Sequence, residues 1–237
     1  MIPGAGLALA CAGGVLGLGD YFGSEAQHFT PVVAGAQDGP ARLVAVFWSG
    51  DMGLRIGFGS DLPERLARQG IPVLAVSSPV LFATGRSPAF ARDAVARSLT
   101  EAIRRSGARQ VAVIGFSFGA DVLAASIGQL EPALRGRIAQ VVLVGPGTGI
   151  HFHANPFGLF YTGRSEADPG AIAASLKGLR LSCIFATGDA DESLCRQPAL
   201  RRGRLTGIDD GHMMLAHREE VTRAVVRSVL DPAEPLS

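Results

Sequence analysis

One segment, residues 111–121, constrains the fold of this chain more than any other. It begins with four apolar residues, Val111 to Ile114, a run that is typical of a strand buried on both faces. The sequence Gly115-Phe116-Ser117-Phe118-Gly119 follows and matches the pattern G-x-S-x-G. Apolar residues then recur at helical spacing from Ala120 to Leu130. A strand, a sharp turn and a helix are therefore predicted, with Ser117 on the turn.

The two glycines explain how this turn could expose a reactive serine. Because Gly115 and Gly119 have no side chains, the strand and the helix can approach closely, which leaves a serine hydroxyl exposed at the carboxyl edge of a sheet. The N-terminus of the following helix also favours negative charge that develops beside Ser117. We therefore interpret Ser117 as a nucleophile; the alternative is a serine that only caps the helix.

Strand and helix patterns alternate along the rest of the chain. Strands are predicted at 43–48, 71–76, 141–144, 183–186 and 204–208, and helices at 61–69, 88–106, 171–176 and 217–230. Such alternation indicates an α/β fold, with a mostly parallel sheet and helices on both of its faces. Residues 23–237 are enough for one domain with a sizeable core. In such sheets the site lies at the carboxyl ends of the strands.

A serine nucleophile needs a base, and the base needs an acid that orients it. His212 lies between the last predicted strand and the last predicted helix, where it could reach Ser117. The acid is expected in the loop after the preceding strand, at residues 188–192. In this loop Asp191 is preferred, and Asp189 is the alternative.

The same edge of the sheet should supply oxyanion donors and a substrate pocket. One donor is expected to be the backbone N–H of Phe118, and the second should come from Asp51 or Met52, after the strand at 43–48. Four side chains are expected to line the pocket, namely Leu54, Phe82, Asp121 and Phe152. The alternative role of Asp121 is to complement the dipole of its helix.

The N-terminal residues and the cysteines indicate in which cellular compartment the protein resides. Residues 1–19 are uncharged and rich in Ala, Gly and Leu, which suits a signal peptide or an anchor, and we take residues 1–22 as this leader. An exported protein is expected, with lipid attachment at Cys11 and a cytoplasmic protein as alternatives. Cys183 and Cys195 flank the acid loop and could form a disulfide in an oxidising compartment; the alternative is two buried thiols.

Several other classes of function lack support in the sequence. A net charge of +1 gives no reason to expect nucleic-acid binding. Neither a dinucleotide-binding pattern nor a P-loop pattern is present. His151 and His153 have no further metal ligands at a suitable spacing, so neither a metal nor a cofactor is expected.

Four segments together resemble a known family. They are Ser49-Gly50-Asp51-x-Gly53, Gly115 to Leu123, the Cys183 to Cys195 segment and Gly211-His212. From about residue 43 to residue 230 the chain is similar to the bacterial virulence protein VirJ and to the VirJ-like C-terminal domain of AcvB. This resemblance implies the α/β-hydrolase fold and a periplasmic serine hydrolase, with Ser117, His212 and an acid in the 189–192 loop as the triad.

The resemblance also implies a substrate class. AcvB-like proteins are implicated in hydrolysing aminoacyl-phosphatidylglycerol, so a lipid ester and contact with a membrane surface are expected. Asp51 and Asp121 could then partner a substrate ammonium group. A carboxylesterase for small soluble esters is an alternative, favoured by the small side chains near Leu54 and Ala83. A second alternative is a non-catalytic, hydrolase-shaped assembly factor of the envelope, because VirJ is implicated in type IV secretion.

Overall fold

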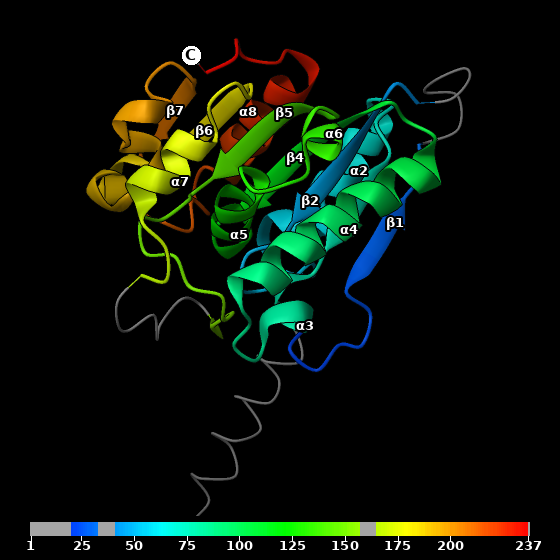
Figure 1. Ribbon diagram of the computed structural model, residues 1–237, viewed down its shortest axis with the longest axis horizontal. Coiled ribbons are helices and arrows are strands. Elements are labelled where there is room, and N and C mark those ends of the chain that lie inside the picture. The colour runs from blue at the N-terminus through cyan, green and yellow to red at the C-terminus, as the bar shows by residue number, and fades with distance from the viewer. Residues whose placement is uncertain (1–19, 33–40, 157–164, 237) are drawn as a thin grey trace, which may run out of the picture.

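The computed structural model describes residues 20–32, 41–156 and 165–236 (Figure 1). Within these ranges, seven strands form one sheet in the order β1-β3-β2-β4-β5-β6-β7. Neighbouring strands run parallel except for β1, which pairs antiparallel with β3 at one edge. The predicted α/β class with a mostly parallel sheet is thus confirmed. Cys11 and most of the expected leader lie outside the described residues.

The elements follow one another in the alternating order that the sequence pattern predicts. The strands are β1 (Gln27–Thr30), β2 (Leu43–Trp48), β3 (Val73–Val76), β4 (Gln110–Phe116), β5 (Ile138–Val144), β6 (Leu181–Ala186) and β7 (Arg204–Ile208). The α-helices are α2 (Leu62–Arg68), α3 (Ser78–Phe82), α4 (Pro88–Ser106), α5 (Phe118–Ile127), α6 (Pro132–Arg135), α7 (Pro169–Ser175) and α8 (Arg218–Leu230). Short 3₁₀ helices are η1 (Gly57–Ser60), η3 (Thr187–Glu192), η4 (Leu194–Arg196) and η5 (Pro198–Leu200).

Helices cover both faces of the sheet, with α4, α5 and α7 in front of it in Figure 1 and α2 and α8 behind. The sheet has a hydrophobic core on each face, and strand β2 contributes side chains to both. Its residues Val44, Val46 and Trp48 belong to the core beneath α4 and α5, whereas Ala45 and Phe47 belong to the core beneath α2 and α8. Side chains alternate between the faces of a strand, so a strand covered on both faces is apolar throughout.

Helix α4 shows how local sequence sets the limits of an element. The Ser87 hydroxyl accepts a hydrogen bond from the Phe90 N–H at 3.1 Å, and Pro88 occupies the first helical position. Gly107, with φ of 69°, ends the helix in a left-handed conformation that glycine adopts without strain. None of the described helices combines the length and the apolar character that crossing a membrane requires.

The described chain begins inside the expected leader of residues 1–22. The Asp20 carboxylate accepts hydrogen bonds from the Leu54 N–H at 3.0 Å and from the Ser77 hydroxyl at 3.1 Å. It also pairs with Arg55 at 3.1 Å. The residues just after position 19 are therefore attached to the folded domain, beside the loop that follows β2.

Candidate active site

Ser117 lies on the sharp turn between β4 and α5, as the sequence predicts. Its backbone has φ of 49° and ψ of −121°, a conformation that non-glycine residues rarely adopt. A Cβ atom on Gly115 would lie 2.6 Å from the Cα of Ala120, and one on Gly119 would lie 2.5 Å from the carbonyl oxygen of Trp48. Both glycines are thus required by close backbone approach, which holds the serine at the edge of the sheet.

Three side chains from three different strand ends meet at this edge. The Ser117 Oγ lies 2.8 Å from the Nε2 of His212, which is within hydrogen-bond distance. On the other side of the ring, the Nδ1 of His212 lies 3.6 Å from the Oδ2 of Asp189. The serine follows β4, the aspartate follows β6 and the histidine follows β7. A hydroxyl, an imidazole and a carboxylate are therefore aligned in the order that a catalytic triad requires.

The acid loop places its two aspartates differently from the sequence preference. Helix η3 is interrupted at Asp189, whose φ of −115° and ψ of 21° are not helical. Asp189 lines the cavity beside His212, whereas Asp191 is exposed and lies outside the lining. The sequence preference for Asp191 rested on its position three residues after Gly188. A residue count does not show which side chain faces His212 where η3 is interrupted. These positions favour Asp189, the alternative acid.

Sequence reasoning missed the residue that organises the loop around His212. The Asp210 carboxylate accepts hydrogen bonds from the N–H groups of Gly211 at 2.8 Å and Ala216 at 3.1 Å. It also lies 3.3 Å from the Nδ1 of His217. These contacts, the Gly211 N–H foremost, hold the pKa of Asp210 below its ordinary value. The Asp-Gly dipeptide in this loop was the available sequence signal, because aspartate side chains bind nearby backbone in turns.

A cavity of about 770 Å³ opens beside Ser117. Asp51 and Met52, the expected sources of an oxyanion donor, both line it. The lining carries four carboxyl groups, which belong to Asp51, Asp121, Asp189 and Glu192. Among the described residues of this lining there is no lysine or arginine. The cavity is therefore suited to a neutral or positively charged ligand.

Three of the four side chains that were expected to line this cavity lie elsewhere. Phe82, which is 0% exposed, packs edge-on against Phe118 with ring centroids 5.4 Å apart. Phe152 is 2% exposed and belongs to the same core. Leu54 is partly buried against the core on the opposite face of the sheet. Of these four side chains only Asp121 lines the cavity, and Phe82 and Phe152 fill the core beneath α4 and α5 instead.

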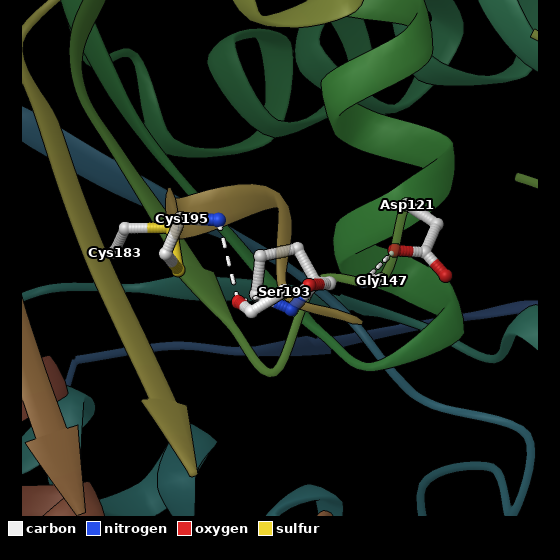
Figure 2. Close-up of a disulfide and its surroundings, with 6 residues drawn as sticks. Asp121, Gly147, Cys183, Ser193 and Cys195 are labelled. Carbon is white, nitrogen blue, oxygen red and sulfur yellow. Dashed lines mark hydrogen bonds between the residues drawn. A yellow bond between two sulfur atoms is a disulfide. The ribbon is translucent and has the colours of Figure 1, made fainter. Parts of the chain in front are cut away.

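Asp121 lies in the first turn of α5, and its Oδ1 accepts a hydrogen bond from the Gly147 N–H at 2.8 Å (Figure 2). Burial raises the pKa of Asp121 well above its ordinary value, and the nearby charge of Asp51 raises it further, while the Gly147 N–H opposes both. Asp51 is 7% exposed and accepts a hydrogen bond from the Asn155 N–H at 2.8 Å. Burial and the same Asp51 charge also raise the pKa of Tyr21.

A disulfide joins Cys183 on β6 to Cys195 in η4, with the Cα atoms 5.6 Å apart. Both cysteines are fully buried, and the bond closes the loop that contains Asp189. Beside Cys195, Ser193 pairs with Gly147 in an antiparallel bridge (Figure 2). The acid loop is therefore attached both to β6 and to the loop that follows β5.

The sheet order, the helices on both faces and the strained serine turn define the class of this protein, which has the α/β-hydrolase fold. Among solved structures it is similar to Est1E of Butyrivibrio proteoclasticus, with a TM-score of 0.62 and 12% identity over 86% of this chain and 94% of that one. A lipase-esterase related protein of Clostridium acetobutylicum has a TM-score of 0.59 and 14% identity over 85% and 98%. An esterase of Pyrobaculum calidifontis has a TM-score of 0.57 and 14% identity over 95% and 92%.

Sequence comparison identifies the family within this class. The model of the bacterial virulence protein (VirJ) family matches residues 42–232. The chain belongs to this family, which confirms the resemblance drawn from its motifs. A comparison with curated proteins gave no match.

Proposed function

We propose that the protein is a serine hydrolase that cleaves a carboxylic ester with Ser117, His212 and Asp189 as its triad. The observation that carries the proposal is the 2.8 Å contact between the Ser117 Oγ and the His212 Nε2. A serine hydroxyl is a weak nucleophile at neutral pH unless a base within this distance can take its proton. Asp189, at 3.6 Å from Nδ1, favours the tautomer that keeps a proton on that nitrogen and leaves Nε2 as the acceptor.

In the proposed reaction, the Ser117 Oγ attacks the ester carbonyl carbon while His212 takes the hydroxyl proton. The N–H of Phe118 and an N–H from the Asp51–Met52 loop stabilise the resulting oxyanion. His212 then gives its proton to the leaving alcohol, and an acyl group remains on the serine. A water molecule, deprotonated by His212, then attacks the carbonyl carbon of this acyl-enzyme. The bond between that carbon and the Ser117 Oγ breaks, the Oγ takes the proton back from His212, and the acid is released.

For the substrate we propose an aminoacyl ester of phosphatidylglycerol. Support comes from the family and from the cavity, whose four carboxyl groups suit a cationic acyl group. We also propose that the protein acts outside the cytoplasm, at a membrane surface. The buried disulfide supports an oxidising compartment, in which such bonds persist.

Labelling with a fluorophosphonate tests the catalytic proposal, because only an activated serine reacts. Wild-type protein should be labelled, and Ser117→Ala should abolish the label. Ser24→Ala, at an exposed position away from the cavity, is the matched control and should be labelled like wild type. A wild-type protein that resists labelling would overturn the proposal and favour the non-catalytic assembly factor.

Incubation with lysyl- and alanyl-phosphatidylglycerol in vesicles tests the substrate. Release of free lysine or alanine by wild type, and not by Ser117→Ala, is the expected result. If a labelled, active serine releases neither amino acid but cleaves small soluble esters, the lipid substrate is rejected and the broad carboxylesterase is favoured.

A further inference from the structure

We propose that Asp121 is the specificity-determining residue of this cavity, and that its carboxylate pairs with the α-ammonium group of an acyl amino acid bound at Ser117. The proposal rests on the ester hydrolysis proposed above and adds a recognition role for one side chain. It implies that esters of amino acids are preferred over esters of uncharged acids of the same shape.

The placement of Asp121 on α5 fits this role. The Asp121 N–H donates to the Ser117 carbonyl oxygen at 3.1 Å, so the two residues are one helical turn apart. Both residues line the same cavity, Ser117 from the turn before α5 and Asp121 from the first turn of α5. In an aminoacyl-enzyme the ammonium group sits on the carbon next to the carbonyl carbon that is bonded to the serine. That group is therefore within a few bonds of Ser117, in the cavity that Asp121 also lines.

The carboxylate of Asp121 is held in place before any ligand binds. Its Oδ1 accepts the Gly147 N–H, and Figure 2 shows the second oxygen pointing away from Gly147. Gly147 is fixed in turn by its bridge to Ser193, two residues before the disulfide-bonded Cys195. A carboxylate that is already oriented loses little conformational freedom on binding, and this favours affinity for a ligand.

The charges around Asp121 favour a cation as its partner. In the part of the chain that the structure describes, no arginine, lysine or histidine forms an ion pair with Asp121. Burial raises the pKa of Asp121, and the charge of Asp51, which repels its carboxylate, raises it further. A substrate ammonium would supply the opposite charge, which none of the described residues supplies through an ion pair with Asp121.

The test compares two esters that differ at one group. L-alanine benzyl ester carries the α-ammonium, and benzyl isobutyrate has a methyl group in its place. The variant is Asp121→Asn, which keeps an acceptor for the Gly147 N–H and removes the charge. The matched control is Asp93→Asn, which removes a carboxylate from the exposed surface of α4.

In Asp121→Asn the kcat/KM for the alanine ester should fall roughly 100-fold, the scale on which a desolvated charge pair contributes. The kcat/KM for benzyl isobutyrate should change by less than about threefold, because that ester makes no use of the charge. Asp93→Asn should leave both values at the wild-type level. If kcat/KM of Asp121→Asn fell equally for both esters, the role of Asp121 would be structural. If it fell for neither ester, Asp121 would have no role in substrate recognition.

Wild-type protein separates this inference from the proposed function. If wild type is labelled at Ser117 and cleaves both esters equally well, the recognition role is wrong while the hydrolase stands. If wild type cleaves neither ester and is not labelled, the proposed function fails and the recognition role fails with it. Should Asp121→Asn not fold, the wild-type ratio of kcat/KM for the two esters decides, and a ratio near one overturns the inference.

Discussion

The strand–helix turn that carries Ser117 and the loops that carry Asp189 and His212 face the same cavity, but different forces hold them. The turn is fixed by backbone contacts that leave no room for a side chain at Gly115 or Gly119. The opposite wall is open to solvent, since the side chains of His212 and Asp189 are 48% and 42% exposed.

The loops of that opposite wall are held by a few hydrogen bonds and a disulfide and not by close packing. The carboxylate of Asp210 holds the loop of His212, and the Cys183–Cys195 bond closes the loop of the acid. Substitutions of Gly115 and Gly119 in the turn should therefore act mainly on stability. Substitutions in the loops should act mainly on the rate, because a misplaced base or acid leaves the rest of the fold unchanged.

The largest effect that tests this contrast is expected at Asp189, the proposed acid. In Asp189→Asn, kcat/KM for an ester should fall roughly 1,000-fold, because an amide favours the wrong tautomer of His212. Asp191→Asn, two residues away in the same loop, should lower it by less than about threefold. Steady-state kinetics on both variants, with thermal melting as the control for folding, decides between the two aspartates. The reverse ranking would restore Asp191 as the acid.

The next effect tests whether the turn is held by packing. Gly119→Ala would bring a Cβ within 2.5 Å of the Trp48 carbonyl oxygen, so it should lower the free energy of unfolding by about 1–3 kcal/mol. A Cβ on Gly211 would meet nothing within 4 Å, so Gly211→Ala beside His212 should change stability by less than about 0.5 kcal/mol. Urea unfolding measures both. Equal destabilisation by the two substitutions would contradict the contrast between the walls.

A smaller effect is expected from Asp210→Asn, which leaves one acceptor oxygen where the carboxylate uses two, one for the Gly211 N–H and one for the Ala216 N–H. We expect kcat to fall roughly tenfold while labelling of Ser117 slows to a similar extent. Because the pKa of Asp210 is lowered in the folded state, its charge stabilises the fold at pH values above its ordinary pKa. This stabilisation is lost as the pH falls through the lowered value. Asp209→Asn is the matched neighbour, and an identical loss of kcat there would show that Asp210 has no special role.

The smallest effect is expected at Asp121. The charge of this carboxylate lowers the stability of the folded protein, whereas the charge of Asp210 raises it. The pKa of Asp121 is raised in the folded state, so the folded protein binds the proton more tightly, and stability declines as the pH rises from the ordinary value to the raised one. Asp121→Asn should therefore melt at the same temperature as wild type, or higher, at neutral pH, and the difference should shrink at acidic pH. A melting temperature that drops at neutral pH would show that the charged carboxylate stabilises the free protein.

The same contrast explains what could be predicted from the sequence. The strand β4, the turn at Ser117 and the helix α5 follow from apolar runs and two glycines, which are local signals of packing. The position of His212 follows from the order of the strands. Leu54, Phe82 and Phe152 were misplaced, because an aromatic or aliphatic residue near a site fits the core as well as the cavity. The choice between two aspartates depended on the interruption of η3, which no residue pattern marks.

The covalent closure of the acid loop has a consequence for when this protein could work. Under the proposed function, a newly made chain in a reducing compartment would lack the bond that positions Asp189. Its sheet could form, since the strained turn needs no cysteine, but its esterase activity would stay low until the thiols were oxidised. Lipids on the side of the membrane where the chain is made would thus be spared, and hydrolysis would begin only after translocation.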